Sequence, residues 1–259
     1  MATELHPSPI YGPVHSRRIG VSLGINLAPD DGKTCSFDCI YCECGFNAER
    51  LPHHPRPTRQ QVKEALERKL QAMRQDGVGL DVLTFAGSGE PTSHPQFAEI
   101  IADTIALRDH YFPDAKVSVL SNSTFAHRPE VYAALMRVDN NILKLDTVSD
   151  EYIRRVDRPC SARYHVDDVV HTLASFHGHV IVQTMFMTGT FEGCDVDNTT
   201  PVYVEPWLKA LRVIQPQEVM IYTIARDTPA PRLQKASRRT LNAIRDRVAC
   251  LGIPCTASY

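Results

Sequence analysis

Six short apolar segments recur along the chain, and each is followed by a longer segment with the apolar spacing of a helix. The apolar segments, which predict strands, are residues 20–27, 81–86, 116–120, 141–146, 180–187 and 218–224. Apolar residues three and four positions apart, which predict amphipathic helices, occur in residues 58–77, 95–105, 129–137, 150–156, 165–176, 202–214 and 237–251. Alternation of strand and helix predicts parallel strands joined by right-handed crossovers. The predicted fold class is therefore α/β, and the order fits a (β/α)6 partial TIM barrel.

Local signals mark where some of these elements begin. Thr58 is a suitable N-cap, and Gln61 three residues later completes a capping box. Pro95 is predicted to occupy the first position of the next helix, where its missing N–H has no cost. Both signals place a helix directly after a polar connection.

The rest of the chain is predicted to connect these elements within one domain. Residues 1–18, which include Arg17 and Arg18, are expected to form an extended lead-in. Residues 189–200 are polar and contain glycine, so we expect a loop there. No change in composition marks a boundary, so residues 1–259 are predicted to form a single domain.

Three cysteines are concentrated in one short stretch. Cys35, Cys39 and Cys42 form the pattern C-x-x-x-C-x-x-C, and thiolates this close on one loop can converge on one metal centre. A [4Fe–4S] cluster takes a thiolate on each iron, so three cysteines leave one iron open to another ligand. A structural zinc site is the alternative, although it usually takes two separated pairs of cysteine or histidine. We expect Cys44 to lie beside the metal rather than to bind it.

Composition narrows the class of protein further. The 259 residues suffice for one α/β barrel, and the apolar fraction of 43% suffices for a sizeable core. The net charge of -2 gives no general electrostatic reason to expect nucleic acid or an anionic membrane as partner. The N-terminus lacks the apolar segment of a signal peptide, and no apolar run approaches the roughly 18 residues of a membrane span. Eight cysteines without a secretion signal indicate a reducing compartment, so we expect a cytoplasmic protein with no membrane partner.

Polar residues gather where the predicted strands end, and functional groups of a parallel barrel lie at those carboxyl ends. They are Gly87, Ser88, Gly89 and Glu90 after the second strand, Asn122 after the third, Lys144 and Asp146 in the fourth, Gln183 in the fifth, and Tyr222 and Arg226 in or after the sixth. Lys144 and Asp146 are two positions apart, so they share one face of their strand. Because an unpaired buried charge is costly, the two either form an internal ion pair or bind a zwitterionic ligand with a ribose.

The cysteine motif resembles that of the radical S-adenosylmethionine (SAM) superfamily, whose fold is a partial barrel of the predicted type. The resemblance implies a [4Fe–4S] cluster whose open iron chelates the amine and carboxylate of SAM. It also implies an enzyme that reductively cleaves SAM to a 5′-deoxyadenosyl radical, which abstracts hydrogen from a substrate that the sequence does not identify. The expected partners are that substrate and an electron donor such as flavodoxin or ferredoxin.

The same resemblance implies roles for residues at the strand ends. Residues 87–90 (GSGE) resemble the family's glycine-glycine-glutamate motif, whose backbone and glutamate contact the methionyl amine of SAM. The other candidates for SAM contact are Tyr41 beside the adenine, Asn122, Lys144 and Asp146 at the carboxylate or ribose, and Gln183 on the adenine side. Tyr222 and Arg226 are candidates for substrate contact, with a solvated ion pair as the alternative for Arg226.

A closer resemblance covers most of the chain. Residues 12–26, FDCIYCECG, GSGEPT, LKLDT, DRP at 157–159 and IYTIAR are together similar to the radical SAM domain of tRNA-wybutosine-synthesis enzymes and their bacterial relatives of unassigned function. This resemblance and the arginines of the last helix favour an RNA nucleoside as substrate, whereas the near-neutral charge favours a small metabolite or a protein residue. A redox-sensing or binding module that does not cleave SAM is a third possibility, although it would not need residues 87–90.

Two smaller sets of residues have ordinary structural explanations. The remaining cysteines, Cys160, Cys194, Cys250 and Cys255, are expected to be buried thiols, with an auxiliary cluster as the alternative. His53 and His54 lie among prolines, so we expect an exposed loop there, with metal binding as the alternative.

Overall fold

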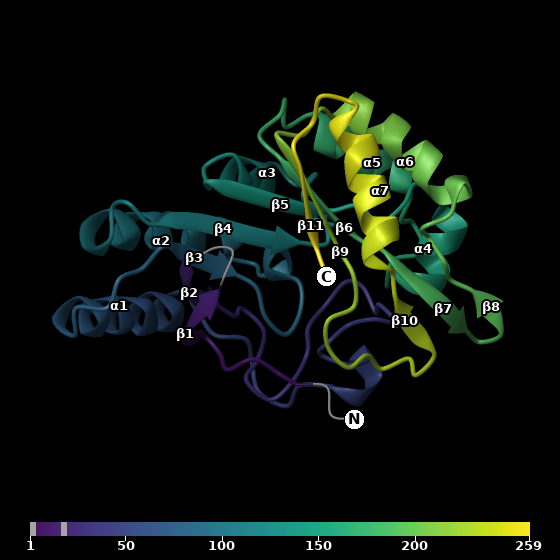
Figure 1. Cartoon of the computed structure of the whole chain (residues 1–259). Helices are drawn as coiled ribbons and strands as arrows, with labels where there is room; N and C mark the ends of the chain where they lie inside the picture. Colours follow the sequence, from purple (N-terminus) through teal and green to yellow (C-terminus); the bar gives the residue numbers. More distant parts are fainter. Residues whose placement is uncertain (1–3, 17–19) are drawn as a thin grey trace.

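One large curved sheet forms the centre of the molecule in the computed structural model, which describes residues 4–16 and 20–259 (Figure 1). Its eight strands have the order β1-β2-β3-β4-β5-β6-β9-β11. Their bounds are β1 (Ile10–Ser16), β2 (Gly20–Ile25), β3 (Val82–Phe85), β4 (Lys116–Ser121), β5 (Asn140–Lys144), β6 (Ile181–Met185), β9 (Glu218–Tyr222) and β11 (Cys255–Ser258). All neighbouring strands are parallel except β1 and β2. The six predicted strands are β2 to β6 and β9, so the α/β fold with a partial barrel is confirmed.

Helices connect the strands and cover one face of the sheet. They are η1 (Asn47–Glu49), α1 (Arg59–Gln75), η2 (Pro91–Ser93), α2 (Phe97–Tyr111), α3 (Pro129–Leu135), α4 (Asp150–Val156), α5 (Val166–Ala174), α6 (Pro201–Ile214) and α7 (Arg238–Ala249). Apolar helix residues such as Leu66 and Leu211 share one buried cluster with strand residues such as Leu83 and Val219. The other face of the strands carries polar pairs, for example Ser22 with Thr84 at 3.0 Å between hydroxyl oxygens. Among the described residues no helix combines the length and hydrophobicity that crossing a membrane requires.

The two predicted helix starts had different outcomes. Thr58 caps α1 with the complete capping box that the sequence indicated. The prediction for Pro95 was wrong, because α2 begins at Phe97 after the N-cap Gln96. The reason is local: the His94 imidazole accepts the Gln96 N–H at 3.1 Å, and the His94 carbonyl accepts the Phe97 N–H at 3.1 Å. His94 therefore fixes the turn that precedes the helix.

Two segments expected to be irregular or extended connections are paired in strands. Residues 10–16 of the predicted lead-in form β1, which pairs antiparallel with β2, whereas Arg17 and Arg18 lie outside the described residues. The loop predicted for residues 189–200 was wrong in its first part, because β7 (Met187–Phe191) and β8 (Cys194–Asp195) form a hairpin there. Its two turn residues, Glu192 and Gly193, have φ values of 52° and 79°, as a two-residue hairpin requires. The strand β10 (Leu233–Lys235) completes this small sheet.

The sheet also extends beyond the last predicted strand. After α7 the chain returns as β11, which pairs parallel with β9. This strand was not predicted, because it is only four residues long and has no clear apolar pattern. The sheet therefore runs from β1 at one edge to β11 at the other, and the carboxyl ends of its parallel strands face the loops that carry the cysteines (Figure 1).

Candidate functional site

The cysteine loop follows β2 and is held against the glycine-rich segment that follows β3. The Thr34 N–H donates to the Ser88 carbonyl at 3.0 Å, and the Glu90 N–H donates to the Thr34 carbonyl at 3.0 Å. Gly89 allows this approach: a Cβ atom there would lie 1.9 Å from the Thr34 carbonyl oxygen, and its φ is 150°. The structure therefore brings the predicted segment of residues 87–90 directly beside the cysteines.

A second segment pairs with the cysteine loop from the other side. The Ile40 N–H donates to the Val156 carbonyl at 2.9 Å, and the Cys160 N–H donates to the Ser36 carbonyl at 2.8 Å. Between these bonds the Asp38 N–H donates to the Asp157 carbonyl at 3.0 Å. The loop is thus fixed along residues 36–40 by residues 156–160, an arrangement that the sequence did not predict.

Glu90 and Asn122 meet at the edge of the cysteine loop. The buried Glu90 carboxylate accepts the Asn122 N–H at 2.6 Å and the Thr92 N–H at 3.0 Å. Burial raises the pKa of Glu90, although these donors oppose the shift. The Asn122 amide donates to the Ser36 hydroxyl at 2.9 Å and lies 3.6 Å from the Cys35 sulfur. Both candidate SAM contacts therefore border the first cysteine, and their contact with SAM stays a prediction.

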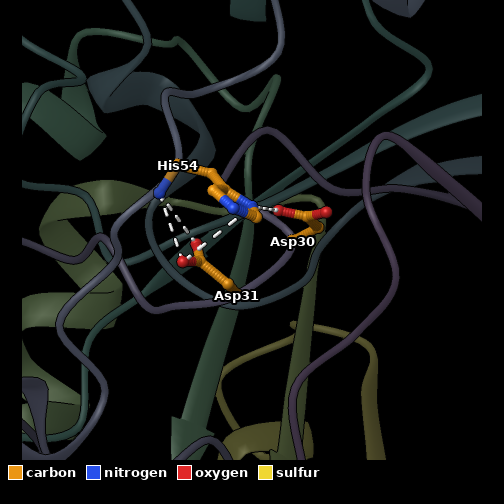
Figure 2. A group of neighbouring side chains, drawn as sticks. All are labelled: Asp30, Asp31 and His54. Atoms are coloured by element: carbon orange, nitrogen blue, oxygen red, sulfur yellow. Dashed lines mark hydrogen bonds and ion pairs between the residues drawn. The ribbon is translucent and has the colours of Figure 1, made fainter.

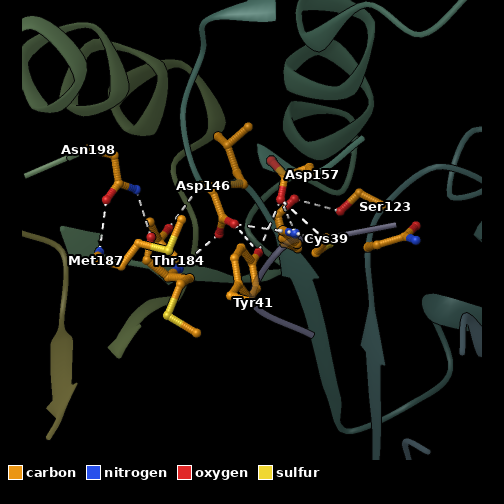
Figure 3. Close-up of polar contacts among 12 residues, drawn as sticks. Cys39, Tyr41, Ser123, Asp146, Asp157, Thr184, Met187 and Asn198 are labelled. Atoms are coloured by element: carbon orange, nitrogen blue, oxygen red, sulfur yellow. Dashed lines mark hydrogen bonds and ion pairs between the residues drawn. The ribbon is translucent and has the colours of Figure 1, made fainter. Parts of the chain in front are cut away.

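A buried group of charges lies on the opposite side of the loop. The Lys144 ammonium lies 3.3 Å from the Asp146 carboxylate, forms an ion pair with Asp157, and donates to the Cys39 sulfur at 3.3 Å. The Tyr41 hydroxyl donates to Asp146 and lies 3.1 Å from Asp157 (Figure 3). The internal ion pair considered for Lys144 and Asp146 is therefore present, and Asp157 joins it.

Burial and charge act against each other in this group. Burial opposes the charge of Lys144, but Asp146 and Asp157 outweigh it and hold the pKa of Lys144 well above its usual value. Burial raises the pKa of Asp146 to about 7, although Lys144 opposes this shift. One cation therefore compensates two carboxylates that are almost inaccessible to solvent, with side chains 1% and 2% exposed.

Replacement of Lys144 by methionine is expected to lower the free energy of unfolding by about 3–5 kcal/mol, because two buried carboxylates lose their cation. Guanidinium denaturation of the metal-free protein measures this change. Lys116→Met, at the exposed start of β4, is the matched control and should stay within about 0.5 kcal/mol of the parent protein. Equal losses in the two variants would show that the ion pair does not stabilise the fold.

The sequence analysis missed Lys33, which points into the same region as the cysteines. Its side chain is 1% exposed, and its ammonium donates to the Gly45 carbonyl at 2.7 Å and lies 4.0 Å from Asp38. Burial opposes its charge, but the neighbouring cysteine sulfurs outweigh it and raise the pKa of Lys33. The only sequence signal was a lysine two positions before Cys35.

The thiols of the loop differ in their surroundings. Burial raises the pKa of Cys35 to about 12, and burial also raises the pKa of Cys39. A hydrogen bond with Cys44 lowers the pKa of Cys42 to about 6 against the effect of burial, and Lys33 adds to this shift. Cys44 is itself buried, and its thiol lies 3.7 Å from the Gly87 carbonyl oxygen. Cys44 therefore supports Cys42 and the glycine-rich segment.

The remaining candidates, Gln183, Tyr222 and Arg226, lie in or just after β6 and β9. The backbone carbonyl of Gln183 accepts the Leu145 N–H at 3.0 Å within the sheet. Tyr222 faces the buried charges, and burial raises its pKa, with Asp146 adding to the shift. Arg226 does not share a strand face with Tyr222, because β9 ends at Tyr222. Its guanidinium is exposed and pairs with Glu43 at 2.8 Å, as the solvated alternative predicted.

The remaining cysteines and histidines are mostly at the surface. The prediction of buried thiols was wrong for Cys160, Cys194 and Cys250, which are exposed, and Cys255 is only partly buried. The exposed loop expected for the two histidines is confirmed. There the His54 imidazole lies 2.9 Å from Asp30, and Asp31 accepts the backbone N–H of His54 at 3.2 Å (Figure 2). Asp30, Asp31 and His54 therefore form a hydrogen-bonded ion pair at the surface.

This chain resembles known proteins in sequence and in fold. The sequence model of the radical SAM superfamily matches residues 31–197. A UPF0026 protein of Helicobacter pylori is 29% identical over 191 residues, and the match covers 73% of this chain and 59% of that protein. The chain thus spans less than two thirds of the length of this relative.

Two solved structures show the same fold at low sequence identity. A radical SAM methyltransferase from Sphaerobacter thermophilus has a TM-score of 0.67 at 15% identity, over 91% of this chain and 65% of that chain. The structure of TYW1 with a lysine-pyruvate adduct has a TM-score of 0.58 at 13% identity, over 88% of this chain and 72% of that chain. These two structures show the fold, and the match of the superfamily's sequence model to residues 31–197 confirms the family indicated by the cysteine motif. The chain belongs to the radical SAM superfamily.

Proposed function

We propose that this protein is a radical SAM enzyme whose [4Fe–4S] cluster is held by Cys35, Cys39 and Cys42. When bound, the cluster would supply the electron that cleaves SAM to a 5′-deoxyadenosyl radical, which abstracts hydrogen from the substrate. The observation that carries this proposal is the placement of three thiols from one loop beside residues 87–90. The buried Lys33 ammonium supports it, because an anionic cluster next to a buried cation is electrostatically favourable.

The chain's own residues would bind and orient SAM. The backbone of Gly87, Ser88 and Gly89 lies along the cysteine loop, so carbonyl oxygens there can accept hydrogen bonds from the amine of SAM. Glu90 would add a carboxylate to that contact, and Asn122 an amide. The remaining candidates for the ribose and adenine are Tyr41, Lys144, Asp146 and Gln183.

Lys144 and Asp146 are already paired with each other and with Asp157. SAM would therefore have to contact these residues without breaking their ion pairs, since an unpaired buried charge costs several kcal/mol. A ribose hydroxyl satisfies that condition, because it is neutral and both donates and accepts hydrogen bonds. We therefore favour the ribose over the carboxylate as the part of SAM that faces Lys144 and Asp146.

Anaerobic reconstitution with iron and sulfide is expected to give about four irons and four sulfides per chain. Strong reduction in the presence of SAM is then expected to release 5′-deoxyadenosine, measured by liquid chromatography and mass spectrometry. One tightly bound zinc without sulfide would contradict the cluster. An intact, reduced cluster that releases no 5′-deoxyadenosine would instead favour a redox-sensing module.

Partners and location follow as parts of the same proposal. All eight cysteines are unpaired in the structure, which favours the reducing cytoplasm as the compartment. An electron donor such as flavodoxin or ferredoxin would reduce the cluster there.

Residues 1–259 would form one radical SAM domain. Deuterium transfer from candidate substrates into 5′-deoxyadenosine would identify the substrate.

A further inference from the structure

A cavity of about 920 Å³ opens on the solvent side of the cysteine loop. Thr34, Cys35 and Ser36 form one wall, the loop after β4 forms the second, and the connection from α4 to α5 forms the third. None of the residues 87–90, Lys144 and Asp146 lines it. The cavity therefore adjoins the site proposed for SAM and shares Cys35 with the cluster, but it has a lining of its own.

Positive charge without acidic partners is concentrated in this cavity. Arg56, Arg128 and Arg163 line it, with Asp168 as its one carboxylate. In residues 4–16 and 20–259, none of these three guanidinium groups forms an ion pair with a carboxylate. Arg56 is half-buried and donates to the Ser93 carbonyl at 2.8 Å, and burial lowers its pKa. A partly desolvated cation that has no carboxylate partner favours an anionic ligand.

The size and the rings of the cavity indicate what kind of anion it fits. A volume of about 920 Å³ falls in the range of small-molecule sites, which are roughly 300–1,000 Å³, and far exceeds what one phosphate occupies. Phe125 and Tyr164 also line the cavity, so an aromatic ring has surfaces on which to stack. The Arg128 guanidinium already lies 4.1 Å from the centre of the Phe125 ring, which brings a cation and a stacking surface together.

We propose that this cavity binds a small phosphate-bearing molecule with an aromatic ring, of the size of a nucleoside diphosphate. The phosphates lie against Arg56 and Arg163, and the ring lies against Phe125 or Tyr164. The proposal does not depend on SAM cleavage, because it concerns binding alone. The limited volume favours a small molecule over an RNA strand, which would need a positive surface continuing outside the cavity.

The exposed thiol of Cys160 provides a direct test, since it lines the cavity. Adenosine 5′-diphosphate is the probe, and mass spectrometry follows alkylation of each cysteine by N-ethylmaleimide. The probe is expected to slow alkylation of Cys160 at least about threefold. Cys194 and Cys250, which are exposed elsewhere, serve as internal controls and should react at unchanged rates. Unchanged alkylation of Cys160 at millimolar probe would overturn the proposal.

Charge-removing variants test where the phosphates bind. The double variant Arg56→Gln/Arg163→Gln is expected to weaken calorimetric binding of adenosine 5′-diphosphate by about tenfold or more. The matched control Arg212→Gln/Arg239→Gln removes two exposed arginines from α6 and α7 and should bind normally. Equal weakening in both pairs would overturn the assignment, and circular dichroism checks that each variant is folded.

Two further probes distinguish the ligand class. Adenosine without phosphate should neither bind tightly nor protect Cys160, and equal protection by adenosine would overturn the role of the arginines. An RNA oligonucleotide that protects Cys160 where adenosine 5′-diphosphate fails, with a steep salt dependence, would replace the small-molecule proposal by an RNA surface. Because these measurements use metal-free and reconstituted protein alike, their outcome is independent of SAM cleavage.

Discussion

Each single change Cys35→Ala, Cys39→Ala or Cys42→Ala is expected to remove most of the cluster and to stop SAM cleavage. The chain offers three thiols on one loop, and the fourth iron position must stay open for SAM. Each substitution therefore removes one of only three protein anchors, and water is a poor replacement for a thiolate on iron. Iron and sulfide counts after anaerobic reconstitution, together with 5′-deoxyadenosine release, measure the effect.

Cys44→Ala is the matched control in the same loop. Its thiol is directed toward the Gly87 carbonyl and hydrogen-bonds to Cys42, and only one residue separates the two cysteines. The variant should keep about four irons and release 5′-deoxyadenosine. If Cys44→Ala lost the cluster while one of the other three variants kept it, the ligand assignment would be wrong.

Lys33→Met is expected to lower the reduction potential of the cluster by on the order of 100 mV. Reduction adds a negative charge, which the buried Lys33 ammonium stabilises. At an effective dielectric constant of about 20 and a separation of roughly 6 Å, that charge contributes about 3 kcal/mol. A factor of ten in a one-electron equilibrium corresponds to about 59 mV, which gives a shift of this size. Methionine keeps an unbranched side chain in the buried space that the lysine stem occupies.

An anaerobic redox titration followed by electron paramagnetic resonance measures this shift without any need for turnover. Lys33→Arg is the control, because it keeps the positive charge in the same place, and its potential should stay near that of the parent protein. A Lys33→Met protein that assembles a full cluster at an unchanged potential would show that the ammonium does not influence the cluster. A variant that fails to assemble any cluster would instead assign Lys33 to holding the loop through Gly45.

The repeating elements could be predicted because their signals are local. Strands such as residues 116–120 are short apolar runs, and the capping box at Thr58 lies within four consecutive residues. The cysteine motif is also local, since its three residues share one loop. Where a signal was local but ambiguous, as at Pro95, an unexpected side-chain contact from His94 decided the outcome.

The parts of the structure that were not predicted depend mainly on contacts between residues far apart in the sequence. Asp157 belongs to the DRP segment at 157–159, which carried part of the family resemblance. Only the folded chain shows that it pairs with Lys144 and with the cysteine loop. In the sequence Lys33 resembles any surface lysine, and only the folded chain shows that its side chain is buried. The hairpin of β7 and β8 had a signal in Gly193, but the polar residues around it indicated a loop.

The pairing of residues 36–40 with residues 156–160 sets an order of events during synthesis. Cys39 contacts Asp157, a residue 118 positions later in the chain, so the loop cannot reach its final shape while only the first half of the chain has left the ribosome. Contacts of this separation form late, because a long segment must first be ordered. Iron and sulfide would therefore enter a loop that residues 156–160 already hold in place. Cells that express the protein faster than they supply iron should accumulate a folded, metal-free form rather than an unfolded one.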